Sequence, residues 1–415
     1  MPFSQLKLSS PLQQALQKSN YLEPTPIQEK VIPLILEGHD IMVEAQTGTG
    51  KSAAFVLPLL ERLAQNPTEG KRKIKILILA PTRELTLQIN ETFSHFAKAL
   101  SPKPKIVSVI GGEGIGEQIY SIQKGCDVIV ATSGRFLDIL SKNQMSLKHL
   151  ECLVLDEADK MLNLGFSEEL DEILKAIPSK RQNLLFSATY PQKILDIASK
   201  VTTEAVKVSL EHSEPTVAKI QQKVIEVNSE NRGPLLRYLL KKEKYKQVLV
   251  FMANKRATDN IAEKFRKRGY LAESFHSDLS QEDRNYTIRE FKAKKIQILF
   301  TTDIISRGLH IDGIDCIINF DLPRSPADYI HRIGRTGRAG QTGVAISFIN
   351  HETQAHFKLI EKRSQIKLER ESIKGYELIG EAPKKVKGPT PIKGKKKSKK
   401  DKLRELVVKN SVSKK

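Results

Sequence analysis

The sequence predicts an α/β protein made of two consecutive domains, each a mostly parallel sheet flanked by helices. Short apolar strands alternate with helical stretches between residues 40 and 208. The same alternation restarts after a polar, proline-containing passage at 210–217. The length agrees, since 415 residues normally form two domains, or three, with sizeable cores.

The expected strands are short apolar runs, as buried parallel strands are. In the first half they lie at 74–80, 126–131, 152–155 and 183–186, with helices at 84–100 and 169–176. In the second half they lie at 247–252, 272–275, 296–300, 316–320 and 343–348. We therefore expect domains at 1–208 and 218–372, a linker at 209–217 and a tail at 373–415.

A phosphate-binding loop is expected between an apolar strand and a helix. It comprises Ala45, Gln46, Thr47, Gly48, Thr49, Gly50, Lys51 and Ser52. Its glycines let backbone N–H groups converge on phosphate oxygens, Lys51 can reach the β- and γ-phosphates, and the Ser52 hydroxyl can hold Mg²⁺. An ordinary glycine-rich turn is the alternative, but the strand-then-helix context favours a nucleotide loop.

An acidic motif follows the strand at 152–155. Asp156 stands at the expected carboxyl end of that strand, where a carboxylate can bind Mg²⁺ directly or through water. Glu157 can orient or activate an attacking water. A helix N-terminus enriched in carboxylates is the alternative, but the apolar strand directly upstream argues against it. The two motifs together predict a site for a nucleoside triphosphate.

An arginine-rich motif in the second half carries the third strong signal. His331-Arg-Ile-Gly-Arg-Thr-Gly-Arg338 places arginines three residues apart, so their guanidinium groups are expected to project together. If this segment faces the phosphate loop, Arg335 and Arg338 can neutralise charge that develops on a γ-phosphate. A solvent-facing basic turn is the alternative interpretation.

Charge is concentrated at the end of the chain. The net charge is +20 with a pI near 9.6, and residues 381–415 hold thirteen lysines and one arginine against three carboxylates, a net +11. Such a segment cannot bury a core, and we expect a basic, disordered tail that attracts a polyanion by counterion release. A solvated tail that only maintains solubility is the alternative.

Composition also bounds the compartment. Cys126, Cys152 and Cys316 lie in apolar runs without metal-ligand spacing, which is typical of buried thiols in a reducing environment. No N-terminal signal pattern and no apolar run of membrane-spanning length is present. We therefore expect a cytoplasmic protein without membrane association.

Taken in order, the motifs resemble those of the DEAD-box RNA helicases of superfamily 2 over residues 3–372, and within that family the bacterial RhlE-like members. The resemblance implies two RecA-like domains, the cofactors ATP and Mg²⁺, and sequence-independent binding of single-stranded and short duplex RNA. It implies RNA-stimulated ATP hydrolysis that separates short duplexes locally or remodels RNA–protein complexes.

The resemblance also assigns residues. It implies adenine stacking by Tyr21, base hydrogen bonding by Gln28 and a supporting contact from Phe3. The implied RNA contacts are Pro81, Thr82, Arg83, Gly112, Thr132, Arg135, Asn254, Thr301, Arg307 and Gly308. The implied residues that couple nucleotide to RNA binding are Asp159, Ser187, Thr189 and His331. Hydroxyls, guanidinium forks and glycine N–H groups suit phosphate and sugar oxygens, which gives a sequence-independent grip.

Four positions depart from the family pattern. Asn20 and Ser277 stand where glycine is common, and Ser133 stands where proline is usual. His310 replaces an aspartate that the family uses toward the ribose, and it offers no fixed negative charge at neutral pH. Asp312 is a displaced substitute.

Other functions remain as alternatives. An ATP-gated RNA clamp or assembly platform fits the same motifs, and so does a DNA helicase or another phosphate-loop ATPase. A GTPase or kinase is disfavoured, because no Asn-Lys-x-Asp loop is present in the second half. Ribosomal or RNA-degradation proteins are possible partners, and we expect a monomeric core.

Removing the lysine-rich segments at 384–387 and 393–400 should reduce the salt dependence of RNA affinity, because fewer counterions are released on binding. Turnover at saturating RNA should stay nearly unchanged. RNA titrations over a salt series, with ATPase assays on the truncated chain, measure both. Loss of turnover at saturating RNA would instead make the tail part of the catalytic assembly.

Overall fold

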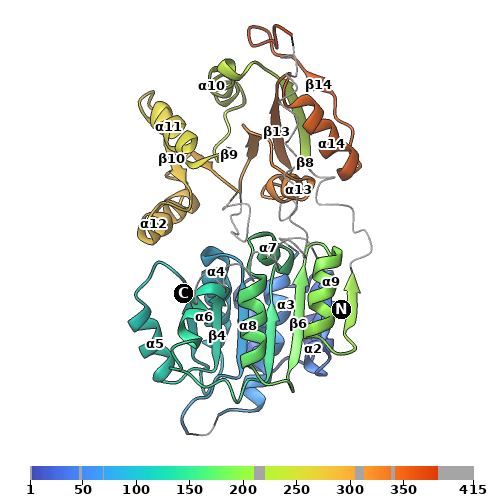
Figure 1. Cartoon of the computed structure of the whole chain (residues 1–415), viewed down its shortest axis with the longest axis vertical. Helices are drawn as coiled ribbons and strands as arrows, with labels where there is room; N and C mark the ends of the chain where they lie inside the picture. Colours follow the sequence, from blue (N-terminus) through green and yellow to red (C-terminus); the bar gives the residue numbers. More distant parts are fainter. Residues whose placement is uncertain are drawn as a thin grey trace, which may run out of the picture. The chain divides into compact units, whose positions relative to one another are not determined.

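The computed structural model describes residues 2–45, 49–68, 70–209, 220–303, 313–337 and 342–381. A compact unit spans Met1–Ile379 and contains two seven-stranded sheets. Every strand pairing within them is parallel. The expected fold class, two parallel sheets with flanking helices, is confirmed (Figure 1).

The first sheet has the strand order β3-β4-β2-β5-β6-β1-β7. Its strands are β1 (Ile41–Glu44), β2 (Ile76–Ala80), β3 (Ile106–Val109), β4 (Val128–Thr132), β5 (Cys152–Leu155), β6 (Gln182–Ser187) and β7 (Val206–Ser209). Its helices are α1 (Ser10–Lys18), α2 (Pro26–Leu36), α3 (Lys51–Gln65), α4 (Arg83–Ala97), α5 (Ile115–Gln123), α6 (Ser133–Leu140), α7 (Ala158–Asn163), α8 (Ser167–Ala176) and α9 (Gln192–Val201). A 3₁₀ turn, η1 (Phe3–Gln5), precedes them.

The second sheet has the order β10-β11-β9-β12-β13-β8-β14, which repeats the first when the strands are numbered from each sheet's own start. Its strands are β8 (Ile220–Glu226), β9 (Val248–Phe251), β10 (Ala272–Phe275), β11 (Ile298–Thr301), β12 (Cys316–Asn319), β13 (Gly343–Ile349) and β14 (Arg370–Glu371). Its helices are η3 (Ser229–Asn231), α10 (Arg232–Glu243), α11 (Lys255–Arg266), α12 (Gln281–Lys292), α13 (Pro326–Ile333) and α14 (Gln354–Ser364). The shared order makes the halves two copies of one topology.

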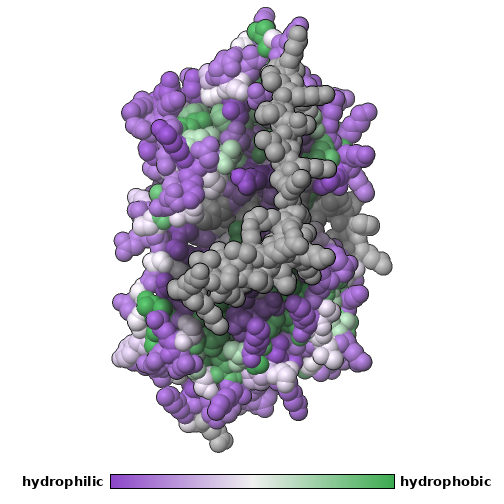
Figure 2. All heavy atoms as spheres, in the orientation of Figure 1, coloured by the Kyte–Doolittle hydropathy of each residue, from purple (hydrophilic) through white to green (hydrophobic). Residues whose placement is uncertain are grey.

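Each sheet is covered on both faces by apolar clusters. In the first, α1 to α4 pack on one face, and α5 to α9 pack on the other. In the second, α12, α13 and α14 share one cluster, while α10 and α11 share the other. Hydrophilic side chains cover most of the visible surface, as Figure 2 shows. Burial on both faces explains why the central strands are continuous apolar runs.

The register of the first sheet gathers the predicted motifs at its carboxyl edge. The Ala45 N–H donates to the Ser187 carbonyl at 3.0 Å, and the Asp156 N–H donates to the Leu79 carbonyl at 3.0 Å. Strands β5, β6 and β1 are neighbours, so the acidic motif, Ser187 and the phosphate loop meet at one edge. The sheet thereby sets the geometry of the site.

The ends of the predicted domains stay a prediction, but two features bear on them. The predicted linker falls largely on 210–219, outside the described residues. Beyond residue 372, Ile373 and Tyr376 still pack against the α10–α11 cluster, and the Tyr376 ring lies 5.6 Å from that of Tyr238. Packing against the second sheet therefore continues to Tyr376, and residues 382–415 lie outside the described part.

Candidate nucleotide and RNA sites

Residues at the start of α2 donate hydrogen bonds to backbone carbonyls of the phosphate loop. The Thr25 hydroxyl donates to the Thr49 carbonyl at 2.8 Å, and Gln28 Nε2 donates to the Gly50 carbonyl at 3.1 Å. Gln28 Oε1 accepts from the Thr25 N–H, which closes a capping box. Gly50 has φ +88°, and a Cβ there would lie 2.6 Å from Gln28 Nε2. Glycine is therefore required by both backbone and packing.

Lys51 begins α3 and points a buried ammonium into the site. Its side chain is 6% exposed, and its Nζ has no hydrogen-bond partner among the described residues. An unpaired buried cation is costly, so an anionic ligand is the expected complement. This donor set at a helix N-terminus fits a triphosphate, with Ser52 next along the helix. Gln46, Thr47 and Gly48 lie outside the described residues.

Asp156 and Glu157 are buried side by side, with their pKa values shifted in opposite directions. Burial raises the pKa of Asp156. Burial alone would also raise the pKa of Glu157, but Lys160 and then Lys51 outweigh it and lower that pKa. Lys160 Nζ donates to Glu157 Oε1 at 2.8 Å, whereas Glu157 Oε2 has no partner among the described residues. A carboxylate held in its charged form suits orienting a water more than taking its proton.

Two residues of the arginine-rich motif lie in the same electrostatic environment. Arg335 is buried and lowers the pKa of Glu157, after the two lysines. His331 is buried as well, and burial followed by the charge of Lys160 holds its pKa well below the usual value, so the ring is neutral. Arg338 lies outside the described residues.

The expectation that the arginines project together is wrong for Arg332. Its side chain is 1% exposed and lies inside the second sheet's own fold. Arg332 Nε donates to Asp303 Oδ1 at 2.6 Å, Nη1 donates to Asn319 Oδ1 at 3.1 Å, and the guanidinium stacks on Phe251. Neighbours three apart on a helix diverge here because α13 ends at Ile333.

The three predicted coupling residues of the first domain, Asp159, Ser187 and Thr189, are joined by hydrogen bonds. The Asp159 N–H donates to Ser187 Oγ at 3.3 Å, and the Thr189 hydroxyl donates to Asp159 Oδ2 at 3.3 Å. The Ser187 hydroxyl donates to the Thr189 carbonyl at 2.7 Å. His331 lies instead in the charged group around Lys160 and Glu157. The coupling role of all four stays a prediction.

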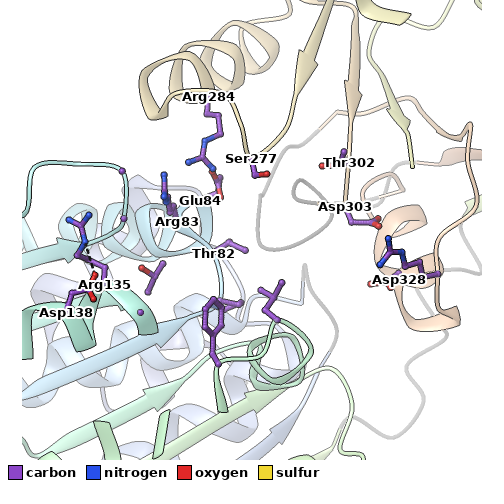
Figure 3. A pocket seen from close by; sticks show the side chains of 18 of the residues that line it. Thr82, Arg83, Glu84, Arg135, Asp138, Ser277, Arg284, Thr302, Asp303 and Asp328 are labelled. Atoms are coloured by element: carbon purple, nitrogen blue, oxygen red, sulfur yellow. Dashed lines mark hydrogen bonds and ion pairs between the residues drawn. The ribbon is translucent and has the colours of Figure 1, made fainter. Parts of the chain in front are cut away.

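A cleft of about 750 Å³ is lined by residues from both sheets, and the predicted RNA contacts of the first sheet lie on it (Figure 3). Its lining from the first sheet includes Pro81, Thr82, Arg83, Gly112, Thr132 and Arg135. Its lining from the second includes Ala253, Ser277, Arg284, Thr302, Asp303 and Arg324. Cationic and hydroxyl side chains along one groove fit a sugar–phosphate backbone.

Arg83 and Arg135 both lie on the side of the cleft that the first sheet supplies. A Cβ on Gly112, which has φ +82°, would collide with the Arg83 guanidinium, so the glycine lets this arginine lie flat. Arg135 Nη1 donates to the Glu113 carbonyl at 2.9 Å. The departure at Ser133 is accommodated, because its buried hydroxyl contacts Met161 Sδ at 3.7 Å.

The sequence did not single out the charged contact that crosses this cleft. Arg284 Nη1 of α12 donates to Glu84 Oε1 of α4 at 2.6 Å, and both side chains are buried. Arg284 Nη2 donates to Gln281 Oε1 at 2.6 Å, which also accepts from Arg83 at 3.5 Å. Figure 3 shows Arg284 directed toward Glu84 and Arg83. Arginine and glutamine three apart at a helix start are too common to signal such a contact.

The remaining predicted RNA contacts differ in placement. Asn254 caps α11, with its Oδ1 accepting from the Ala257 N–H at 2.9 Å. Thr301 is fully buried and donates to carbonyls of its own sheet, so Thr302 rather than Thr301 lines the cleft. Arg307, Gly308, His310 and Asp312 lie outside the described residues.

The predicted adenine-binding residues surround the start of α2. Tyr21 is 39% exposed, with its ring 5.6 Å from that of Phe96. Phe3 is buried in the cluster under α1 to α4. Asn20 has φ +58°, a left-handed conformation that asparagine tolerates best after glycine, which explains the departure there. Their roles toward adenine stay predictions.

Two repeated parallel sheets, with a phosphate loop on the first and a buried arginine of the second near it, define an ATPase of the tandem RecA-like class. The described residues hold no helix both long and apolar enough to cross a bilayer. The family model for DEAD/DEAH box helicases matches residues 25–197, and the model for the helicase conserved C-terminal domain matches residues 231–340.

The chain belongs to the DEAD-box ATP-dependent RNA helicases, a family that uses ATP with Mg²⁺. It is 40% identical over 368 residues to the DEAD-box ATP-dependent RNA helicase CshA of Bacillus subtilis, covering 89% of this chain and 73% of that protein. The RhlE-like grouping stays a prediction.

Two solved structures support the fold. The structure of S. cerevisiae Dbp5 bound to RNA and ADP BeF3 is similar with a TM-score of 0.80 and 29% identity, covering 89% of this chain and 95% of that chain. A DEAD box protein from Methanococcus jannaschii has a TM-score of 0.53 at 38% identity, covering 89% and 99%.

Gly50→Ala should reduce ATP affinity more than tenfold, because the added Cβ displaces Gln28 or the loop. Gly38→Ala is the control: it has a similar φ of +87° but nothing within 4 Å of its Cβ. Both variants should lose about 1–2 kcal/mol of unfolding free energy from backbone strain. Titration with a fluorescent nucleotide separates them, and equal affinity losses would contradict the packing argument.

Arg332→Ala should destabilise the protein by about 3–5 kcal/mol, because Asp303 and Asn319 lose a buried cation. Arg324→Ala should leave stability nearly unchanged, because Arg324 is exposed on the cleft wall. Urea unfolding of both variants measures this difference. If the Arg332→Ala variant were fully stable but had low ATPase activity, Arg332 would act at the nucleotide site rather than in the fold.

Proposed function

We propose that this helicase couples RNA binding to ATP hydrolysis by bringing Arg335 of the second domain to the γ-phosphate held at the first. The observation that carries the proposal is the charge of Arg335 acting on buried Glu157, one position after Asp156. The first domain supplies Lys51 and Lys160 to the site, whereas the arginine comes from the second domain. An arginine in that position stabilises the charge that develops in the transition state.

The first domain supplies binding and orientation. Lys51 neutralises phosphate charge, Ser52 and Asp156 would hold Mg²⁺, and Glu157 orients the attacking water. The metal, when bound, neutralises charge that develops on the phosphate oxygens. Gln28 and Tyr21 select adenine with support from Phe3, and the hydrogen bond from Gln28 to the Gly50 carbonyl would transmit base binding to the loop.

RNA would lie along the cleft that both sheets line. Arg83, Arg135 and Thr82 offer donors from the first sheet, and Thr302 offers a hydroxyl from the second. Asn254, which caps α11, would add a contact next to the described lining. Each domain alone presents half of these contacts, so RNA favours the arrangement in which both are used. The buried Glu84–Arg284 pair supports the same arrangement, since its charges are desolvated only together.

The set of Asp159, Ser187 and Thr189 would transmit the nucleotide state to this cleft. Asp159 is the last residue of the acidic motif Asp-Glu-Ala-Asp, and Ser187 ends β6. A change at Asp156 and Glu157 would reach Ser187 and Thr189 through the two hydrogen bonds of Asp159. Neutral His331 can add a hydrogen bond from the second domain without adding charge.

An ATP-gated RNA clamp remains the second candidate, because the same contacts would hold RNA without separating strands. A strand-displacement assay on a short tailed duplex distinguishes the two, since a clamp binds in an ATP-dependent way but releases no strand. Equal stimulation of ATPase activity by DNA and RNA would favour a DNA helicase instead.

We also propose that the protein acts as a monomer in the cytoplasm, with ribosomal or RNA-degradation proteins as partners. Three free, buried cysteines support a reducing compartment. Burial raises the pKa of Cys126 and of Cys152 to about 12, so these thiols are unreactive. Size-exclusion chromatography with light scattering tests the monomer.

Arg335→Ala should lower RNA-stimulated turnover by roughly 10³-fold while ATP affinity without RNA changes little, because the arginine acts on the transition state. Arg289→Ala is the control, as its side chain is 71% exposed. Steady-state ATPase assays with and without RNA, and nucleotide titrations, measure these effects. If the unaltered protein hydrolyses ATP at the same rate with and without RNA, RNA binding and ATP hydrolysis are not coupled.

A further inference from the structure

A second cleft, of about 910 Å³, lies at the amino-terminal edge of the first sheet. It forms where β2, β5 and β6 begin and where α3 ends. Among the described residues that line it, the charged ones are the cations Arg62, Lys73, Lys75, Lys148, Lys180 and Arg181 and the one carboxylate Glu151. We call it the basic cleft.

Much of this positive charge is uncompensated. Glu151 is engaged by Lys75, with Nζ to Oε1 at 3.5 Å. In the described part of the chain, Lys73, Lys148 and Lys180 are exposed and make no ion pair. Arg181 Nε and Thr68 Oγ1 are buried atoms of the same lining that lack a hydrogen-bond partner there. The basic cleft thus offers both charge and donors to a ligand.

The neighbouring cleft along the same edge shows that this is a local feature. It shares Gly38 and Arg181 with the basic cleft but also includes Asp40 and Glu204. Its lysines are paired: Lys175 with Glu172 at 2.6 Å and Lys200 with Asp171 at 3.5 Å. Of these two clefts, the basic cleft therefore carries the larger excess of unpaired positive charge.

The lining favours one kind of partner. Clustered lysines and arginines without carboxylate partners attract polyanions by counterion release. Lysine is depleted from the cores of protein interfaces, and the basic cleft presents no phenylalanine, tyrosine or tryptophan to anchor a protein or stack a base. Its chemistry matches the phosphodiester backbone rather than a base or an apolar side chain.

We propose that the basic cleft is a second RNA-binding surface, which holds the backbone of RNA flanking the segment in the cleft between the two sheets. The proposal rests on RNA being the substrate. Glu151 and Asp156 flank β5, so the basic cleft and the ATPase edge are about 16 Å apart across the sheet. The RNA segment bound there is therefore distinct from the segment that lies between the two sheets. It would anchor the enzyme on long RNA.

The test compares two full-length variants that lose equal charge at the same edge. Lys148→Gln/Lys180→Gln removes uncompensated cations of the basic cleft, and Lys175→Gln/Lys200→Gln removes paired ones. Fluorescence anisotropy over a salt series is measured with a long single-stranded RNA and with a short oligoribonucleotide. Thermal unfolding and RNA-saturated ATPase rates confirm that both variants are folded and active.

Only the basic-cleft variant should bind the long RNA about fivefold more weakly. Its slope of log affinity against log salt should be shallower by about 1.4, as expected for two lost phosphate contacts on a single strand. Its affinity for the short oligonucleotide and its RNA-saturated turnover should match those of the unaltered protein.

Three results would overturn the proposal: equal weakening by the paired-lysine variant, equal weakening on the short oligonucleotide, or no change on the long RNA. If binding of polyglutamate falls while RNA binding does not, the surface serves an acidic protein. Each result is independent of RNA stimulation in the unaltered protein, on which the proposed function depends.

Discussion

The burial of charge at the carboxyl edge of the first sheet is the constraint on which the rest of the site depends. Lys51, Asp156, Glu157, Lys160 and Arg335 are each at most 6% exposed. Burial removes water from these charged groups, and protein hydrogen bonds replace only part of it. Lys51 Nζ and Glu157 Oε2 lack hydrogen-bond partners among the described residues. Such a cluster is costly until a ligand of complementary charge enters. The unpaired Lys51 ammonium and Glu157 oxygen therefore suit a ligand that brings both negative charge and a cation, as a metal-bound triphosphate does.

The same cluster explains why the two neighbouring carboxyl groups can differ in role. Asp156 is desolvated with limited compensation, so its pKa rises, while two lysines outweigh burial at Glu157 and lower its pKa. Adjacent groups driven apart in this way are typical of sites that assign distinct tasks to each. Asp156 gains most from a cation, whereas Glu157 is already a stable acceptor. These opposite pKa shifts support the proposed assignment of Asp156 to the metal and of Glu157 to the water.

Sequence patterns predicted most of the central strands but missed three of the four edge strands. Cys152–Leu155 has the expected bounds, because strands buried on both faces are continuous apolar runs. The edge strand β10 was found at Ala272–Phe275 although its residues are mixed. The edge strands β3, β7 and β14 and the inner strand β8 were missed, since their residues are partly exposed and their pattern is mixed. Among site residues, spacing found Lys51 and Asp156. It failed for Arg332, whose partners come from β11, β12 and their following loops, which no local pattern encodes.

The two edges of the first sheet carry different kinds of residues. Because its strands are parallel, all their carboxyl ends lie at one edge and all their amino ends at the other. At one edge, glycine-rich turns and buried charges form a site whose geometry must be held to fractions of an ångström. At the other, exposed lysines precede β5 and β6 and need no fixed geometry to attract a backbone of phosphates. A short strand such as β5 is long enough to keep these functions apart and rigid enough to hold them in one body. Substitutions at the amino-terminal edge can therefore change the affinity for RNA without disturbing the residues at the ATPase site.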